Sequence, residues 1–282
     1  MRRWWYLAAL APACVTAWWS APWASAGAPL ANPEDGRVAD GAYTNEYFRM
    51  AYRLPSGWDK DLDGPPPSYA GYYVLTALTG EGARPGTMLI AAQDRFFGPA
   101  PAASSVELVS HLHHRISEID GMTIDHDPLE TTIAGRRFVR IDFRGVGLFR
   151  TTLVTESRCH FVSFNFTTSA LAVLHDLVLS LNDLSLGEPP GTGDSIPVCV
   201  KDYATPERVW LRAEPTPAAP KFTVVPVRII IGTDGRVRHI HVIRGSVEQR
   251  ASIIAALTQW RFEPPVINGR PTEVETGLKF PF

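Results

Sequence analysis

Three aspartates in the first quarter of the chain have the spacing of a calcium-binding loop. Asp59, Asp61 and Asp63 precede Gly64 and match the opening of the pattern D-x-D-x-D-G, in which alternate carboxylates ligate the ion. Such a loop needs a bidentate glutamate at its twelfth position, where this chain has Ala70, and prolines follow the glycine. We therefore expect a solvated acidic turn and no bound metal, with the aspartates kept as weak candidates.

Histidines are the next residues that could bind a metal or sense pH. His111 and His114 lie one turn apart on a predicted helix, but no third ligand lies near them in the sequence, and a metal site needs more than two. His239 and His241 share one side of a predicted strand, opposite Ile240, so we expect both to face solvent or a partner. A pH-sensitive contact surface is the alternative to plain exposure there.

No sequence pattern typical of an enzyme or a cofactor site occurs. The chain has no Gly-x-Ser-x-Gly elbow, P-loop, dinucleotide fingerprint, Cys-x-x-Cys pair or His-Glu-x-x-His run. The net charge of −2 gives no indication of nucleic acid binding. We therefore expect a binding protein that uses no cofactor and is not an enzyme.

The N-terminus has the features of a targeting segment. Arg2 and Arg3 are followed by uncharged, apolar-rich sequence as far as Glu34, and the run Ala24-Ser25-Ala26 provides the small residues that a signal peptidase requires. We expect residues 1–26 to be a signal peptide that is removed. An uncleaved membrane anchor is the alternative, because the uncharged stretch is long enough to span about 30 Å of hydrocarbon. In both cases the rest of the chain leaves the cytoplasm.

Two cysteines remain in the exported part, Cys159 and Cys199, which lie 40 positions apart. An oxidising compartment permits a disulfide between them, and this bridge would clamp the connector that carries Cys199 to the preceding domain. Two separate thiols, with Cys159 buried in a strand, are an equal alternative. The sequence alone does not give the Cα separation that decides between them.

Residues 43–186 have the pattern of an α+β domain. Apolar and polar residues alternate in strand-like runs, as around Ile141, and apolar stripes at helical spacing predict helices over 104–119 and 169–184. Strands, a helix, further strands and a closing helix predict an antiparallel sheet with two helices. A flexible lead is predicted over 27–42, and a linker with Pro and Gly is predicted over 187–220.

The opening of this domain resembles the PsbP-like α/β sandwich family. The resemblance rests on Phe48 and on the run Tyr52-Arg53-Leu54-Pro55-Ser56-Gly57-Trp58, a strand followed by a proline and a Gly-Trp pair. It implies an α/β sandwich over most of residues 43–186.

Residues 221–282 predict a smaller β-β-α-β domain. Apolar residues alternate along 225–231, and Asp234-Gly235 favours a tight turn into a second strand. Ser246, with Gln249 three residues later, forms a capping box that begins a helix. After two prolines that end the helix, residues 273–280 form the third strand.

This smaller domain resembles the C-terminal domain of TonB-type energy transducers. The resemblance rests on the run Gln259-Trp260-Arg261-Phe262-Glu263-Pro264-Pro265 and on the Asn-Gly turn that follows it. The positions that match the family are Gly235, Trp260, Pro264, Asn268 and Gly269, followed by the final strand. We interpret Trp260 as a core anchor and both glycines as turn residues, which form the fold and do no chemistry.

The resemblance implies function by strand addition, in which an extended segment of a partner pairs with the edge of the sheet. The implied edge is the final strand, and its candidate partner-binding residues are Val274, Thr276, Leu278 and Phe280. Replacing Thr276 with Pro is expected to remove an edge donor.

The function predicted from these features is that of a periplasmic, TonB-like accessory protein that binds an envelope partner and is linked to outer-membrane transport. The partner would be an outer-membrane receptor or an inner-membrane motor complex, and a homodimer is a further option. One alternative is a transducer anchored in the inner membrane, but a folded domain and a seven-residue Pro-rich stretch, Glu214 to Pro220, stand where its long spacer would be. The other alternative is a soluble periplasmic ligand-binding or metal-binding protein.

Overall fold

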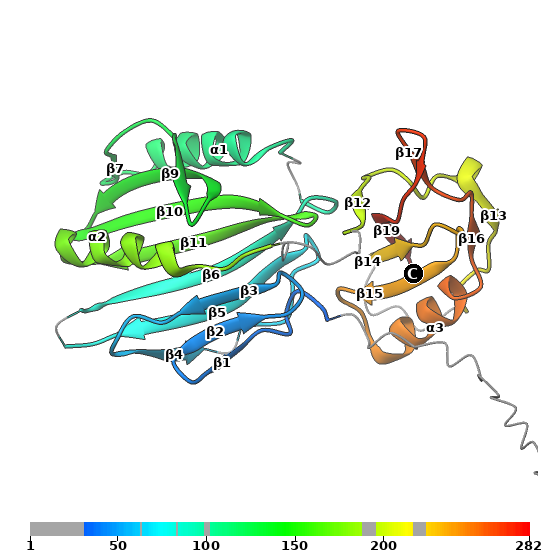
Figure 1. Ribbon diagram of the computed structural model, residues 1–282, viewed down its shortest axis with the longest axis horizontal. Coiled ribbons are helices and arrows are strands. Elements are labelled where there is room, and N and C mark those ends of the chain that lie inside the picture. Colours follow the sequence, from blue (N-terminus) through cyan, green and yellow to red (C-terminus); the bar gives the residue numbers. More distant parts are fainter. Residues whose placement is uncertain (1–30, 63, 83, 99–101, 188–195, 217–223) are drawn as a thin grey trace, which may run out of the picture. The chain divides into compact units, whose positions relative to one another are not determined.

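A computed structural model of the chain describes residues 31–62, 64–82, 84–98, 102–187, 196–216 and 224–282 (Figure 1). The predicted signal peptide or anchor, residues 1–26, lies outside the described residues, as do the two most Pro-rich parts of the predicted linker. Within the described ranges, no helix has the length and apolar character needed to cross a membrane.

The folded region begins earlier than predicted. β1 (Arg37–Ala39) pairs with β2 (Ala42–Asn45), and β2 pairs with β3 (Met50–Arg53), both antiparallel. The two residues between β1 and β2, Asp40 and Gly41, both have positive φ, which is the geometry of a tight hairpin turn. Residues 37–42 therefore belong to the folded domain rather than to a flexible lead, because an Asp-Gly turn closes a hairpin there.

The main sheet of the described residues has eight strands. They are β4 (Trp58–Leu62), β5 (Tyr72–Gly80), β6 (Gly86–Asp94), β7 (Thr123–Ile124), β8 (Leu129–Ile133), β9 (Arg136–Gly145), β10 (Leu148–Ser157) and β11 (His160–Thr168). Their order is β4-β5-β6-β11-β10-β9-β7, with β8 also paired to β9, and every pair is antiparallel. This order brings the end of β6 beside the beginning of β11, where part of the candidate site lies.

Two helices pack on this sheet, α1 (Ser105–Ser117) and α2 (Leu171–Ser180), and a 3-10 turn (Leu181–Asp183) follows α2. α1 packs with Phe161 of β11, whereas α2 packs with Phe164 of the same strand. Residues at odd and even positions of a strand point to opposite faces, so the two helices cover opposite faces of the sheet. The predicted antiparallel sheet with two helices is confirmed.

The C-terminal part of the chain forms a separate four-stranded sheet, called the small sheet below. β14 (Val224–Ile231), β15 (Val237–Val242) and β19 (Val274–Pro281) are antiparallel, and the short β12 (Val198–Cys199) adds a parallel strand beside β19. α3 (Val247–Leu257) begins with the predicted capping box. It packs on the face that carries alternate apolar side chains of β14. The predicted β-β-α-β unit is therefore present.

The predicted linker contributes to this second domain. β12 comes from residues 187–220, and so does β13 (Val209–Leu211), which follows a 3-10 turn (Pro206–Arg208) and pairs with β16 (Arg261–Phe262). Tyr203 lies in the second hydrophobic core. Residues 196–216 are thus not a spacer, because their apolar side chains cover a core that the β-β-α-β unit alone would leave open. The last hairpin consists of β17 (Val266–Ile267) and β18 (Arg270–Pro271).

Candidate functional site

The final strand, β19, has a complete neighbour on one side and an incomplete one on the other. Along its whole length it pairs with β14, from Val274 opposite Ile231 to Pro281 opposite Val224. On the other side, β12 pairs with Val274 and Glu275 and no further. Within the described residues, no strand pairs with the outer side of β19 from Thr276 onward.

The direction of the backbone groups along this open stretch follows from a proline in the neighbouring strand. Lys279 lies opposite Pro226, which has no N–H and cannot donate a hydrogen bond. The carbonyl of Pro226 points toward β15, because it accepts from the N–H of Ile243 just after that strand. Lys279 is therefore in a non-hydrogen-bonded pair, and its own N–H and C=O point away from β14. Backbone direction repeats every second residue, so the N–H and C=O of Gly277 also point away from β14. Glu275 agrees with this pattern, because its carbonyl accepts from the N–H of Val200, which follows β12.

This geometry corrects the predicted edge residues. Thr276, Leu278 and Phe280 direct their backbone groups toward β14, because they alternate with the outward-facing residues. The side chains of Val274, Thr276 and Phe280 are buried. Proline at 276 would therefore break the sheet instead of removing an edge donor. Among the described residues, the outward-facing backbone groups of the edge that no strand pairs belong to Gly277 and Lys279.

A groove of about 410 Å³ runs beside the open stretch of β19. One wall consists of the end of the chain, Leu278 to Phe282, together with Trp260. The other wall is formed by residues 204–215, in which Arg212 pairs with Glu214 at 2.8 Å. The groove thus combines unpaired backbone groups with aromatic side chains, which is the composition of a site for an extended peptide.

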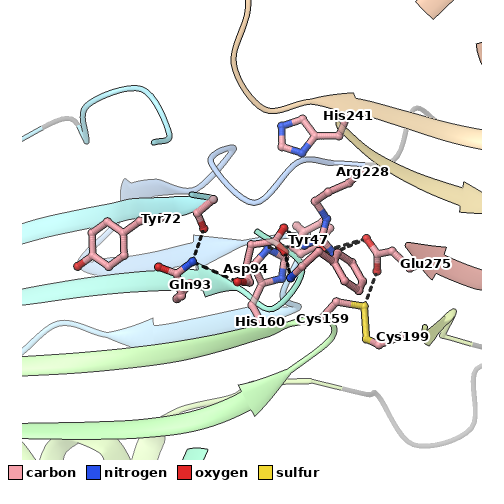
Figure 2. Close-up of polar contacts among 12 residues, drawn as sticks. Tyr47, Tyr72, Gln93, Asp94, Cys159, His160, Cys199, Arg228, His241 and Glu275 are labelled. Atoms are coloured by element: carbon pink, nitrogen blue, oxygen red, sulfur yellow. Dashed lines mark hydrogen bonds and ion pairs between the residues drawn. A yellow bond between two sulfur atoms is a disulfide. The ribbon is translucent and has the colours of Figure 1, made fainter. Parts of the chain in front are cut away.

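The face of the small sheet that points away from α3 carries a buried charged cluster, which was not predicted from the sequence (Figure 2). Arg228 of β14 is 1% exposed, and its guanidinium forms ion pairs with Asp94 at the end of β6 and with Glu275 of β19. Its Nη2 lies 2.6 Å from Glu275 Oε1 and also donates to the hydroxyl of Tyr47 at 2.9 Å. Its Nη1 lies 2.8 Å from Nε2 of His160, the first residue of β11.

Burial and opposite charge together set the ionisation of this cluster. Burial acts against the charge of Arg228, but Asp94 and Glu275 outweigh it, and the pKa of Arg228 lies well above its ordinary value. Burial likewise raises the pKa of Glu275, yet Arg228 outweighs this and holds that pKa below its ordinary value. At Asp94, burial prevails over Arg228 and raises the pKa. Burial and Arg228 hold the pKa of His160 well below its ordinary value, so this ring is neutral near pH 7.

A disulfide between Cys159 and Cys199 lies next to this cluster (Figure 2). Cys159 precedes His160, and its Sγ lies 3.3 Å from Oε2 of Glu275. Cys199 is in β12, so the bridge fixes β12 to the first domain while β12 pairs with β19. Of the two alternatives that the sequence left open, the structure has the bridge.

Among the motif residues of the TonB-like domain, Trp260 lies in the core and Gly235 and Gly269 lie in turns. Trp260 is 3% exposed, packs in the second core and donates from Nε1 to the carbonyl of Ala213 at 2.8 Å. Gly235, Asn268 and Gly269 all have positive φ in turns. Pro264 follows β16 and is exposed.

Among the described residues, the sequence candidates for metal binding do not come together. Asp59 is exposed, whereas the side chain of Asp61 and all of Asp63 lie outside the described residues. On α1, His111 and His114 each lie within 4.0 Å of a carboxylate one turn away, Glu107 and Glu118. No group of three His, Cys, Asp or Glu among the described residues is placed to hold a metal ion.

The expectation that His239 and His241 face solvent or a partner is wrong for His241. This side chain is buried, and its Nε2 lies 2.9 Å from Oε1 of Glu34 near the start of the described chain. The expectation assumed a sheet covered on one face. In the structure, the face that carries His241 and Arg228 is covered by the first domain.

The residues that sequence reasoning missed are Tyr47, Asp94, His160, Arg228 and Glu275. One signal was available, since Arg228 interrupts the apolar run Val224 to Ile231. A charge in a strand that is otherwise apolar requires a buried partner of opposite charge. No local sequence pattern marks Tyr47, Asp94 or His160 as partners of Arg228, because they lie far from it in the chain.

Comparison with known proteins supports the resemblance seen in the C-terminal part of the sequence. Residues 221–282 match the family described as Gram-negative bacterial TonB protein C-terminal. Among solved structures, the solution structure of cyanobacterial PsbP from Synechocystis sp. PCC 6803 is a distant match, with 13% sequence identity and a TM-score of 0.38. It covers 54% of this chain and 96% of that chain. No curated protein matches the chain.

Proposed function

We propose that this chain is an extracytoplasmic envelope protein that binds an extended segment of another envelope protein by strand addition to β19. The TonB-type match of residues 221–282 supports a TonB-like role in the envelope. The disulfide between Cys159 and Cys199 supports a location outside the cytoplasm, since disulfides persist in oxidising compartments. The proposed role is binding, not catalysis.

The observation that carries this proposal is the open stretch of β19 beyond β12. Outward-facing N–H and C=O groups of Gly277 and Lys279 have no strand partner among the described residues, and Lys279 is exposed. An unpaired strand edge is a template for another chain unless something covers it. Hydrogen bonds from only two residues do not suffice to hold a partner. The groove beside the edge adds an apolar surface on which side chains of the partner can pack.

Backbone pairing alone would hold a partner weakly. Each new hydrogen bond replaces bonds to water and contributes about 0.5–1.5 kcal/mol net. We therefore expect most of the affinity to come from partner side chains that pack on Leu278 and Phe282, which are partly exposed in the groove. The hydrogen bonds would fix register and direction.

A proline at position 279 tests this mode of binding directly. Because the N–H of Lys279 points outward, Lys279→Pro removes a donor from the free edge and leaves the pairing with β14 intact. Lys279→Ala removes the same side chain and keeps the N–H, so it is the matched control. The mature full-length chain, wild type or variant, would be immobilised and exposed to detergent extracts of the envelope.

Strand addition predicts that wild type and Lys279→Ala enrich the same protein and that Lys279→Pro enriches it about tenfold less, the equivalent of one lost hydrogen bond plus a steric conflict. Circular dichroism and thermal unfolding must show that the proline variant is folded. Equal capture by a folded Lys279→Pro would refute strand addition at this edge.

We further propose that the protein acts as a free accessory protein, released by cleavage after Ala26, and not as an anchored transducer. The mass of the chain recovered from membrane and soluble fractions distinguishes the two. A soluble chain that starts at Gly27 is expected, whereas a full-length chain in the inner membrane would favour the transducer.

A further inference from the structure

His160 lies where side chains from both domains meet. It is fully buried, and its Nε2 lies 2.8 Å from Arg228 Nη1 and 3.8 Å from Asp94 Oδ2. The rings of Tyr47 and Tyr73 stand edge-on to it at centroid distances of 5.4 and 5.5 Å. The other charged or titratable groups around it are Arg158 from the turn before β11, His241 from β15 and Glu275 from β19.

The contact between His160 and Arg228 requires a neutral imidazole. A guanidinium has donors and no acceptor, so Nε2 must accept and the single ring proton lies on Nδ1. Nδ1 is buried and has no hydrogen-bond partner among the described residues. A second proton would have to enter at Nε2, where it would set two donors of like charge against each other at 2.8 Å.

The strand pairing allows a second arrangement in which every charge would keep a partner. Asp94 and His160 belong to neighbouring strands of the main sheet, β6 and β11, and pair in register. Arg228 and Glu275 belong to neighbouring strands of the small sheet, β14 and β19. A protonated His160 can therefore pair with Asp94 within one domain while Arg228 keeps Glu275 within the other.

We propose that His160 is an acid-triggered release for the junction between the two domains, which works by this exchange of partners. When the ring is neutral, Arg228 bridges the domains by binding Asp94 and His160. When the ring is protonated, His160 takes Asp94, and Arg228 is left with Glu275 in its own sheet. The buried face of the small sheet then separates from the first domain, and the inference holds whether or not β19 binds a partner strand.

Release of the junction is expected without unfolding of either domain. The core around α2 and β11 and the core around α3 and β14 are separate clusters. Ile243, the residue just after β15, packs in the first core, and release would break this contact. The disulfide between Cys159 and Cys199 keeps the two domains joined in the released state, so release is reversible.

Hydroxyl-radical footprinting of the full mature chain, with mass spectrometry of peptides, tests the proposal, because release exposes side chains while the backbone hydrogen bonds within both domains stay in place. Labelling would be carried out at about pH 7.5 and about pH 5, with the radical dose calibrated at each pH on a free peptide, so that protection is compared directly. The junction is reported by Phe96 and Ile243, which are buried where the two domains meet. The first core is reported by Phe164.

Two variants isolate the histidine. His160→Gln keeps an acceptor that Arg228 can bind and cannot gain a proton, whereas His175→Gln on the exposed side of α2 removes a histidine that does not touch the cluster. If His160→Gln does not fold, histidine ring resonances of the wild type, followed by NMR across the same pH range, replace it. Titration of His160 must then coincide with loss of junction protection.

In the wild type and in His175→Gln, acid is expected to lower protection of the junction side chains by up to about tenfold for each pH unit between the ordinary histidine pKa of about 6.5 and the lower pKa of buried His160, while the core side chain stays protected. In His160→Gln the junction is expected to stay protected at both pH values. The proposal is overturned by pH-independent junction protection in the wild type, by the same acid response in His160→Gln, or by simultaneous loss of protection in junction and core.

Discussion

Arg228 in the small sheet and Asp94 at the end of β6 form a buried ion pair between positions 134 residues apart. Both side chains are at most 2% exposed, so the pair replaces all of the water that would otherwise solvate two charges. Such a pair contributes little net stability, because desolvation offsets attraction. Its effect is to specify where the small sheet docks, since a shifted placement would separate Arg228 from Asp94 and leave a buried carboxylate without its partner.

Removing Arg228 should lower the free energy of unfolding by far more than the net contribution of the ion pair to that free energy. Arg228→Met leaves two buried carboxylates, Asp94 and Glu275, without their partner. We expect the free energy of unfolding, measured by urea denaturation, to fall by about 3–5 kcal/mol.

Two further variants separate charge from packing in that experiment. Neutralising the carboxylates in the same background, with Asp94→Asn and Glu275→Gln, is expected to restore much of the loss. Arg238→Met on the adjacent β15 removes a half-exposed arginine and should change stability by no more than about 0.5 kcal/mol. A cost for Arg228→Met as small as that for Arg238→Met would contradict the buried cluster.

The disulfide should matter for one strand in particular. Cys159→Ala with Cys199→Ala is expected to lower the free energy of unfolding by about 2–4 kcal/mol. Because β12 pairs with β19 through two residues, it should lose hydrogen-exchange protection more than β14 does. Unchanged protection of residues 196–201 in the double variant would show that β12 holds its place without the bridge.

Two glycines of the TonB-like motif offer a matched pair. Both have positive φ, +75° at Gly235 and +76° at Gly269. A Cβ at Gly235 would meet the carbonyl oxygen of Phe262 at 2.1 Å, whereas a Cβ at Gly269 meets nothing within 4 Å. Gly269→Ala should cost about 1 kcal/mol of backbone strain, and Gly235→Ala should cost clearly more, as judged by thermal unfolding. Equal costs would mean that the turn at Gly235 does not approach β16.

The contact between Glu34 and His241 predicts a pH dependence in acid. Burial raises the pKa of Glu34, but the hydrogen bond and charge of His241 outweigh it, and the pKa lies below its ordinary value of 4.5. A carboxyl with a lowered pKa contributes stability that is present above its unfolded pKa and is lost as pH falls through its folded pKa. The stability difference between wild type and Glu34→Gln should therefore shrink as pH drops below about 4.5.

Urea midpoints of wild type and Glu34→Gln between about pH 7 and pH 3 measure that difference. Glu46→Gln, an exposed carboxyl in the same N-terminal part, serves as the control. A difference between wild type and Glu34→Gln that stays constant with pH would show that the carboxylate does not pair with His241.

Local patterns predicted the parts of the fold that local physics determines. The stripe from Val109 to Ile116 marked α1, Ser246 and Gln249 marked the beginning of α3, and the alternation along 225–231 marked β14. In each case the signal is a period or a cap that lies within a few residues of the element it forms. The TonB-like domain was recognisable for the same reason.

What the sequence could not provide was the second face of the small sheet. A hairpin covered by one helix predicts a solvated opposite face, so His241 was expected outside. Burial of that face depends on Asp94 and His160, which lie far from Arg228 in the chain and are ordinary strand residues by pattern. Linker composition likewise concealed β12, whose place beside β19 moves the open edge to Gly277 and Lys279.

The central claim is that a partner strand meets the chain at Lys279. A photo-cross-linking residue placed at position 279 of the full-length protein, in its native envelope, tests it most directly. Position 238, on β15 at the opposite side of the same sheet, is the matched comparison. The account predicts an adduct from position 279, mapped to an extended segment of one envelope protein, and none of that protein from position 238. Adducts of the same protein from position 238 but not from 279 would contradict it.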